Sequence, residues 1–281
     1  MHDVGEHVLE ELRQIEKKEN VRILYACESG SRAWGFPSKD SDYDVRFLYV
    51  RPVEWYLSIY EKRDVIERPI SDMLDINGWD LRKALNLFRK SNPPLLEWLQ
   101  SPIVYRENHE VADQIRCIAP FTFSPRSCMH HYLHMAKGNY REYLQGELVK
   151  IKKYFYVLRP ILACEWIEKH NTMPPIEFGR LVDAILPRES ELKEIIGGLL
   201  VRKRAGDEMD YEPRINAINT FLEERMEFYG RISAGMQSSD GGQDQRLDEL
   251  FRSVLTQVWE QGNENNTTKP KGFKLGYDYK M

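Results

Sequence analysis

The first hundred residues change from a helical to a strand-like hydrophobic pattern. Apolar residues recur every three or four positions over residues 4–19, which predicts an amphipathic helix. The runs "VRILYAC" (21–27) and "YDVRFLYV" (43–50) are rich in strand-forming residues, and weaker runs follow at 63–68 and 73–76. The pattern therefore predicts a helix followed by a small, mixed β-sheet.

From residue 79 the hydrophobic period becomes helical and stays so. The segment "WDLRKALNLFRKS" predicts a helix that "NPP" ends, and "LLEWLQ" begins another. Pro160 lies within a long apolar helix and should kink it, because proline removes a backbone donor. The remaining predicted helices cover "SPRSCMHHYLHMAKGNYREYL", "KIKKYFYVLRPILACEWIEKH" and roughly residues 176–186, 189–204, 213–233 and 246–261.

This change of period defines the fold class and the domains. We predict an α+β protein with an N-terminal domain over residues 1–118, in which helices flank a small mixed sheet. An all-helical domain is expected over residues 119–262, and a polar, flexible tail over residues 263–281. The segment 235–245 has the composition of a linker.

Composition narrows the class of protein. The 281 residues are 42% hydrophobic, which is enough for ordinary cores, and the formal net charge of -4 gives no global nucleic-acid footprint. Four scattered cysteines lack CxxC spacing and predict reduced thiols. No signal peptide or membrane-spanning run is found, so we expect a cytoplasmic protein without a membrane partner. The sequence does not indicate an oligomeric state.

Two aspartates stand at the head of the second predicted strand. Asp42 and Asp44 are one residue apart, so on an extended strand they point to the same side, with Cα atoms about 7 Å apart. Paired carboxylates repel each other unless a cation or proton lies between them, and hard oxygen ligands suit Mg²⁺ or Mn²⁺. The spacing therefore predicts a metal site.

A phosphate-binding turn and a third acid complete the predicted site. Gly30 permits close backbone approach or an unusual φ, and Ser31 offers a hydroxyl and an N–H at the start of a turn or helix. Asp75 is the best-placed third carboxylate because apolar residues flank it; an unpartnered acid there would be costly to bury. Asp72 and Asp80 compete for this role, although Asp80 is better placed to cap the following helix.

These motifs resemble a known group of proteins. The stretch "GSRAWGFPSKDSDYDVRF" resembles the motif of DNA polymerase beta superfamily nucleotidyltransferases: a hydrophobic-Gly-Ser turn followed by Asp-hydrophobic-Asp-hydrophobic. Five segments together resemble the RNA repair pathway DNA polymerase beta family, over about residues 20–165. They are "GSRAWGF", "SDYDVRF", "LDINGWDLRKAL", "KSNPPLLEWLQSPIVY" and "KKYFYVLRPILAC". The large aromatic Tyr43 between the aspartates is the one departure from the motif.

The resemblance implies roles for these residues and a reaction. Gly30 and Ser31 would hold a nucleoside triphosphate, Asp42 and Asp44 would ligate the metals, and Asp75 would be the third acid. The implied reaction transfers a nucleoside monophosphate from an NTP to an acceptor hydroxyl. An RNA 3′ end, such as that of a damaged tRNA, is the acceptor that the family name indicates. A small molecule or a protein side chain is the alternative acceptor.

Several basic residues are further candidates for nucleotide binding. Arg32 and Arg46 could contact phosphates or pair with the acids. In "KIKKYFYVLR", Lys152, Tyr156 and Arg159 share one helix face, with Lys153 adjacent, so charge could serve the phosphates and stacking the base. A solvated basic face is the alternative.

Other functions stay open on the sequence. A degenerate nucleotidyltransferase fold could bind nucleotide or a toxin without catalysis. His130 and His134 are one helical turn apart, but no third zinc ligand has suitable spacing. Arg126 and His131 match the loose Arg-x4-His pattern of helical ribonuclease domains, although partly buried helix histidines are the commoner explanation of such a pattern.

Overall fold

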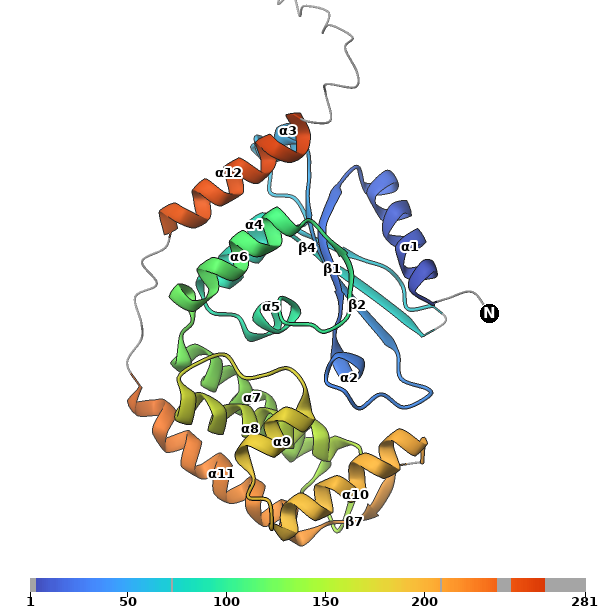
Figure 1. Cartoon of the computed structure of the whole chain (residues 1–281), viewed down its shortest axis with the longest axis vertical. Coiled ribbons are helices and arrows are strands. Elements are labelled where there is room, and N and C mark those ends of the chain that lie inside the picture. The colour runs from blue at the N-terminus through green and yellow to red at the C-terminus, as the bar shows by residue number, and fades with distance from the viewer. Residues whose placement is uncertain (1–3, 72, 208, 237–243, 261–281) are drawn as a thin grey trace, which may run out of the picture.

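The chain folds into a sheet-containing N-terminal lobe and a C-terminal lobe of helices (Figure 1). The structure is a computed structural model that describes residues 4–71, 73–207, 209–236 and 244–260. The α+β class predicted from the sequence is confirmed. The strands of the N-terminal lobe are β1 (Arg22–Glu28), β2 (Tyr43–Val50), β3 (Val65–Glu67), β4 (Leu74–Asp80) and β5 (Val104–Glu107).

These strands form one mixed sheet in the order β3-β4-β2-β1-β5. The β2–β4 pair is parallel, whereas the neighbouring pairs are antiparallel. The chain can return in the same direction because the short helix α3 (Val53–Tyr56) and β3 lie between β2 and β4. The parallel register places Asp44 directly opposite Asp75.

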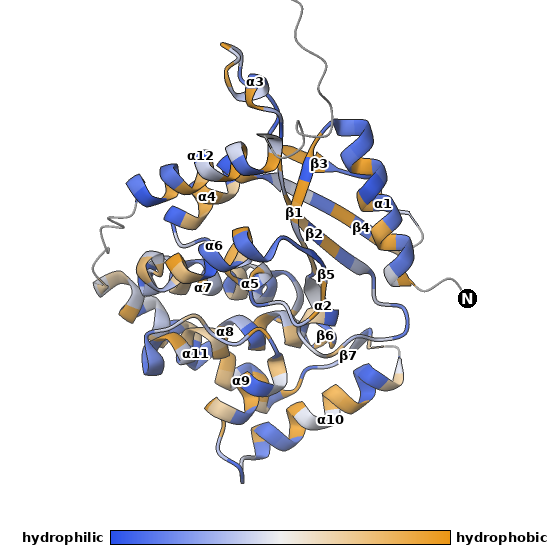
Figure 2. Cartoon of the chain, turned by 45° about the horizontal axis from the view of Figure 1, so that its top comes forward, coloured by the Kyte–Doolittle hydropathy of each residue, from blue (hydrophilic) through white to orange (hydrophobic). Residues whose placement is uncertain are grey.

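Helix α1 (Val4–Glu19) covers one face of the sheet (Figure 1). Its apolar positions Val8, Leu12 and Ile15 are fully buried in one cluster with inward side chains of β1, β2, β3 and β4. Its outer side is hydrophilic (Figure 2). The predicted helix over residues 4–19 is therefore confirmed, and its burial follows from the helical spacing of the apolar residues.

The other sheet face packs on helices that lead into the C-terminal lobe. A continuous apolar core runs from Leu24 and Leu48 of the sheet through α7 and α8, which pack side by side. Helix α8 continues through Pro160. The helices are α4 (Leu81–Arg89), α5 (Pro93–Trp98), α6 (His109–Thr122), α7 (Pro125–Tyr143), α8 (Lys153–His170), α9 (Phe178–Ile185), α10 (Glu191–Ala205), α11 (Asn216–Gly235) and α12 (Asp244–Glu260).

The C-terminal half is helical as predicted, apart from a two-stranded pairing that the sequence analysis missed. Strands β6 (Leu148–Lys150) and β7 (Tyr211–Pro213) pair antiparallel beside the start of α8. The predicted domain boundary at residue 118 lies inside α6, so the division into domains stays a prediction. The predicted tail over 263–281, and residues 237–243 of the predicted linker, lie outside the described residues.

The loop between α2 (Gly30–Ala33) and β2 joins the two lobes. The Trp34 carbonyl accepts a hydrogen bond from the Phe178 N–H at 2.9 Å, and the Gly35 carbonyl accepts one from Arg204 at 3.1 Å. Phe36 stacks on Phe155 of α8, with ring centroids 5.0 Å apart. The loop that follows the predicted phosphate turn is therefore held against the helical lobe.

Candidate active site

Two of the three predicted acids meet across the parallel strand pair. Arg46 Nη2 lies 2.9 Å from Asp44 Oδ1 and 2.7 Å from Asp75 Oδ2, so one guanidinium bridges both carboxylates. Burial raises the pKa of Asp44, and the neighbouring charges of Asp75 and Asp42 raise it further, while Arg46 opposes both effects. The pair is held close together in a partly buried position, where an additional cation would be favourable.

Asp42 lies at the edge of this pair. It is exposed, it precedes β2, and its charge contributes to the raised pKa of Asp44. In the part of the chain that the structure describes, no three His, Cys, Asp or Glu side chains form an assembled metal-binding group. The assembled part of the site is thus Asp44 with Asp75, and Asp42 is close by.

Arg32 fixes the loop that carries Asp42. Its Nε donates to the Asp42 carbonyl at 3.2 Å, and its Nη2 donates to the Ser41 carbonyl at 2.8 Å. The guanidinium also lies 3.6 Å from the centre of the Tyr43 ring, a cation–π contact. The aromatic residue between the two aspartates is therefore part of the packing that orders this loop.

The predicted phosphate turn packs directly on the second aspartate. Gly30 has a φ of +59°, and a Cβ placed on it would lie 2.0 Å from Asp44 Oδ2. Both the left-handed backbone and the close approach therefore require glycine here. The Ser29 N–H donates to the Asp44 carbonyl at 2.8 Å, and the adjacent Ser31 is buried. Gly30 and Ser31 thus lie at one site with Asp44 and Asp75.

Glu28, the last residue of β1, was missed by the sequence analysis. Its side chain is fully buried, its Oε1 accepts the Asp44 backbone N–H at 2.8 Å, and the Tyr105 hydroxyl donates to its Oε2. Burial raises the pKa of Glu28, although these two hydrogen bonds oppose the increase. The sequence pattern that could have indicated Glu28 is an acidic residue at the end of an apolar run, in "ACESG".

Tyr156 of α8 faces the acidic pair from the helical lobe, and Lys153 lies next to Tyr156. Burial raises the pKa of Tyr156, and the charges of Asp44 and Asp42 raise it further. The Tyr156 ring lies edge-on to Trp34 at 5.7 Å, and Lys153 Nζ lies 4.9 Å from the Tyr156 ring centre. Of the four residues predicted on this helix, Tyr156 thus lies beside the acids, and Lys153 lies one ring further away from them.

The other two residues of this predicted set lie differently. Lys152 is exposed at the start of α8. Arg159 is only 1% exposed; its Nη1 lies 2.9 Å from Glu97 Oε1, and its guanidinium lies 4.6 Å from the Trp34 ring centre. This geometry favours a structural role for Arg159, in which its guanidinium packs on the Trp34 ring. The contact between Arg159 and nucleotide stays a prediction.

The competing sites have simpler structural explanations. Asp80 caps α4 by accepting the Arg82 N–H at 2.9 Å, as expected, and Asp72 lies outside the described residues. His130 and His134 are exposed, and burial lowers the pKa of His131. Over the described ranges these histidines take part in no metal-binding group.

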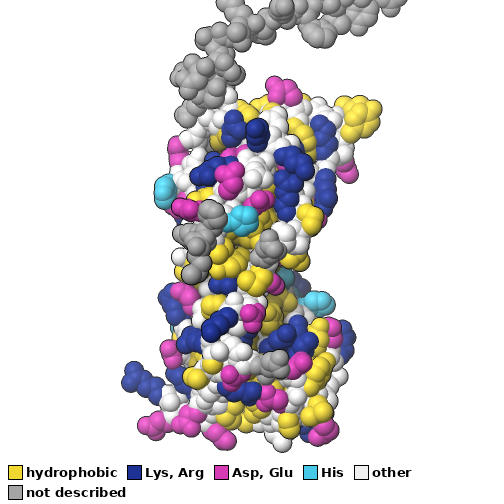
Figure 3. Space-filling view, turned by 90° about the vertical axis from the view of Figure 1, so that its right-hand side faces the viewer, with side chains coloured by type: hydrophobic (Ala, Val, Ile, Leu, Met, Phe, Trp, Pro, Cys, Tyr) yellow, Lys and Arg dark blue, Asp and Glu magenta, His cyan; other side chains and the backbone are white. Residues whose placement is uncertain are grey.

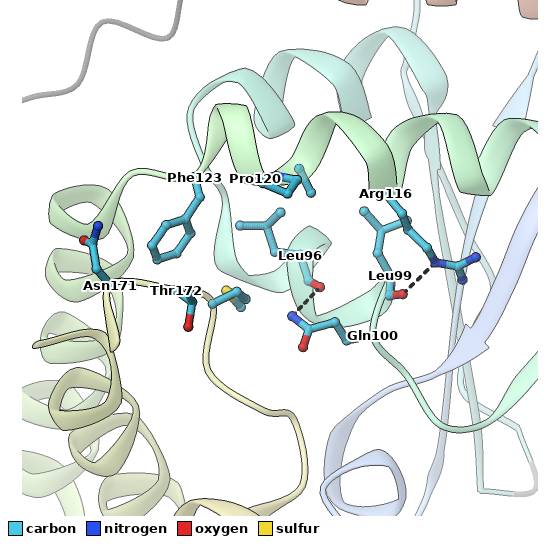
Figure 4. A pocket seen from close by; sticks show the side chains of 10 residues that line it. Leu96, Leu99, Gln100, Arg116, Pro120, Phe123, Asn171 and Thr172 are labelled. Carbon is cyan, nitrogen blue, oxygen red and sulfur yellow. Dashed lines mark hydrogen bonds between the residues drawn. The ribbon is translucent and has the colours of Figure 1, made fainter. Parts of the chain in front are cut away.

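A separate apolar cavity of about 380 Å³ lies between α5, α6 and the segment that follows α8 (Figure 4). Its polar groups are largely engaged: Arg116 Nε donates to the Leu99 carbonyl at 3.1 Å, and Gln100 donates to the Leu96 carbonyl at 3.4 Å. None of the acids discussed above lines it. The cavity is therefore distinct from the acidic site.

The mixed sheet, the Gly-Ser turn and the paired carboxylates define a protein of the polymerase-beta-like nucleotidyltransferase class. The chain belongs to the RNA repair pathway DNA polymerase beta family, whose sequence model matches residues 4–253. It is 51% identical over 257 residues to an uncharacterized protein, YcgL, of Bacillus subtilis (strain 168); the match covers 92% of this chain and 98% of that protein. The predicted family membership is confirmed.

A solved structure was also found. It is the crystal structure of a nucleotidyltransferase-like protein from Exiguobacterium sibiricum 255-15, which is 11% identical and covers 89% of this chain and 90% of its own. The TM-score between the two structures is 0.27. Among the residues described, no helix has the length and apolar character needed to cross a bilayer.

Proposed function

We propose that this protein is a metal-dependent nucleotidyltransferase that transfers a nucleoside monophosphate from an NTP to an acceptor hydroxyl. The observation that carries the proposal is the convergence of Asp44 and Asp75 on adjacent parallel strands, with Gly30 packed on the Asp44 carboxylate. A surface hairpin with polar decoration would not require a glycine at this contact.

The donor set suits Mg²⁺ or Mn²⁺. Asp44, Asp75 and Asp42 supply hard oxygen ligands, and Arg46 neutralises only part of their charge. We propose that the three carboxylates hold the metal. When bound, the ion polarises the phosphate and stabilises the negative charge that develops on the entering and leaving oxygens.

The chain's own residues orient the triphosphate. The Gly30 turn lets the phosphates approach the backbone closely, and the Ser31 N–H and hydroxyl are donors for their oxygens. Lys152 and Lys153 neutralise phosphate charge from the helical lobe, and Tyr156 offers a ring for the base. Arg46 keeps Asp44 and Asp75 together, and Arg32 holds the loop of Asp42. We include both arginines as candidates for phosphate contact.

In the proposed reaction, the acceptor hydroxyl oxygen forms a bond to the α-phosphorus. The bond from that phosphorus to the bridging oxygen breaks, and pyrophosphate leaves. The hydroxyl proton passes to the carboxylate of Asp75. An RNA 3′ end, such as that of a damaged tRNA, is the proposed acceptor; the family to which the chain belongs supports it, whereas the net charge of -4 does not.

The test is label transfer from each α-labelled NTP, with Mg²⁺ or Mn²⁺, to mixed RNA. Asp44→Asn and Asp75→Asn are expected to lower transfer at least about 100-fold, because each removes a metal-ligating charge. Asp40→Asn is the matched control, because Asp40 is an exposed acid in the loop that leads to β2, and this variant should retain transfer. Equal labelling by wild type and both site variants would reject the catalytic assignment.

Arg46 favours one alternative, a non-catalytic nucleotide-binding module. Its guanidinium already neutralises charge between Asp44 and Asp75, so the pair can persist without a metal. This alternative predicts nucleotide binding that is independent of Mg²⁺ and no label transfer to any acceptor. Isothermal titration of a non-hydrolysable NTP, with and without Mg²⁺, separates it from the catalytic proposal.

A further inference from the structure

Aromatic rings and lysines alternate along the helical lobe, in a row that begins near the acidic pair and leads away from it. Lys153 Nζ lies 4.9 Å from the Tyr156 ring centre and 4.2 Å from that of Tyr143. Tyr143 and Tyr211 are close enough to interact electrostatically, and Lys150 Nζ lies 5.9 Å from the Tyr211 ring centre. We name these five residues the lysine–tyrosine track.

The track is built by four elements that the fold fixes in place. Tyr143 ends α7, Lys153 and Tyr156 lie in the first turn of α8, and Lys150 pairs directly with Tyr211 across β6 and β7. The Lys152 N–H donates to the Met209 carbonyl at 3.2 Å, which ties α8 to the segment before β7. Backbone hydrogen bonds therefore help to fix the positions of the lysine and tyrosine side chains along the track.

The outer part of the track is accessible, and its lysines lie close enough to repel one another. Tyr211 is 61% exposed. Over the described residues, no carboxylate forms an ion pair with Lys150, Lys152, Lys153 or Lys203, whereas nearby Arg202 pairs with Glu212. Burial lowers the pKa values of Lys153 and Lys203, and repulsion from neighbouring lysines lowers them further, whereas the charge of Glu142 opposes the shift of Lys153. A polyanion would relieve this repulsion.

The position of the track suits a strand that enters the acidic site. Figure 3 shows that the outline narrows between the lobes and that basic, acidic and hydrophobic side chains are interspersed on the lower lobe. The charges of Asp42 and Asp44 raise the pKa of Tyr156, so this end of the track lies close to the acids. Lys150 and Tyr211 form the other end, on the β6–β7 pair.

A single nucleotide cannot occupy all of these groups. One NTP offers one base, which the proposed function assigns to Tyr156, and one triphosphate. Tyr143 and Tyr211 add two more rings, and Lys150 adds a cation beside them. A single-stranded polynucleotide offers unstacked bases and phosphates in alternation, which matches alternating rings and ammonium groups. Duplex RNA keeps its bases stacked and offers no free faces.

We propose that the lysine–tyrosine track binds the single-stranded 3′ end of an RNA and leads it to the acidic pair. The role of that strand as acceptor rests on the proposed function, but the binding itself does not. Tyr143 and Tyr211 stack on bases, and Lys150 contacts a backbone phosphate. The inference therefore names a surface for the acceptor and the form of RNA that it takes.

The test is fluorescence anisotropy with a short, 5′-fluorescein-labelled, single-stranded oligoadenylate and with the duplex made from it. Wild type is expected to bind the single strand more tightly than the duplex. Tyr211→Ala should raise the Kd for the single strand about tenfold, the usual effect of losing one stacking contact. Tyr211→Phe should retain binding, because the ring is kept.

Lys150→Gln provides a second, independent measurement. It should weaken binding and reduce the slope of log Kd against log salt by about 0.7, the value for one phosphate contact on a single strand. Tyr60→Ala and Lys62→Gln are the matched controls, because both side chains are exposed on the other lobe. Both controls should bind RNA as wild type does.

The outcomes separate this inference from the proposed function. Equal Kd values of Tyr211→Ala and Tyr60→Ala for the single strand, or no binding of the single strand by wild type, would contradict the proposal that the track binds RNA. Calorimetry of a non-hydrolysable NTP with Mg²⁺ should give wild-type affinity for Tyr211→Ala, whose side chain lies outside the nucleotide site. RNA binding that persists in a protein without any label transfer would retain the track and reject the proposed transfer.

Discussion

Replacement of Gly30 by alanine tests the contact on which the candidate site depends. The residue has a φ of +59°, and the added Cβ would lie 2.0 Å from Asp44 Oδ2, where real contacts stay above 3.0 Å. The Asp44 carboxylate must therefore retreat by about 1 Å or more. That movement would stretch its 2.9 Å hydrogen bond to Arg46 beyond an effective length.

Two terms set the size of the effect. The left-handed backbone costs an alanine about 1–2 kcal/mol, and loss of a hydrogen bond between charged groups costs about 1.5–3 kcal/mol. Because the second term applies to a partly exposed pair, we expect Gly30→Ala to lower the free energy of unfolding by about 2–4 kcal/mol. A misplacement of about 1 Å in a ligating carboxylate should also lower label transfer about 100-fold.

Gly35→Ala is the matched control, because it separates the backbone term from the clash. Gly35 has a φ of +84°, but no atom lies within 4 Å of its added Cβ. Urea unfolding should therefore show a loss of about 1–2 kcal/mol for Gly35→Ala, and label transfer should persist. If the two variants lose equal stability and equal activity, the contact between Gly30 and Asp44 does not organise the site.

Two further predictions concern the buried charged side chains Asp80 and Arg159. Burial raises the pKa of Asp80 above its ordinary 3.8, so the folded chain retains this proton longer than the unfolded chain, and the resulting stability is lost as the pH rises through the folded-state pKa. Urea unfolding should show wild type losing stability relative to Asp80→Asn as the pH rises above 3.8; a constant difference would contradict this. Arg159→Met leaves Glu97 buried without its cation and should cost about 3–5 kcal/mol of unfolding free energy, whereas the affinity for a non-hydrolysable NTP in calorimetry should stay at the wild-type value. A selective loss of that affinity would instead place Arg159 in the nucleotide site.

The parts of the fold with regular hydrophobic patterns could be predicted from the sequence. Helix α1 and strands β1 and β2 agree with their predicted ranges to within a residue, because their apolar spacing is unambiguous. Strand β4 was predicted only over residues 73–76. It continues to Asp80 because Gly78 and its neighbours pair with β2 and β3, and no local pattern reports such pairing.

Residues that depend on distant pairing were missed. Strand β5 is four residues long and lies at the sheet edge, where half-buried side chains give little alternation. Without β5, the sequence gives no reason to place Tyr105 beside Glu28. Without that contact, nothing distinguishes Glu28 from the other acidic residues of the chain. Gly30 and Asp44, by contrast, belong to one local motif, so their proximity and an unusual φ at Gly30 could be predicted, although the value of that φ and the atom that Gly30 contacts could not.

Arg46 changes the physical argument for a metal. On the sequence alone, the repulsion between Asp42 and Asp44 predicted a cation, but the chain supplies one cation itself, and the closest acidic pair is Asp44 with Asp75. Repulsion within that pair therefore does not by itself require a metal. Asp44 and Asp75 share one guanidinium, and with Asp42 close by they still carry excess negative charge; the raised pKa of Asp44 reflects burial together with its two acidic neighbours. The case for a divalent ion rests on this remaining charge and on oxygen ligands placed beside a turn suited to phosphate.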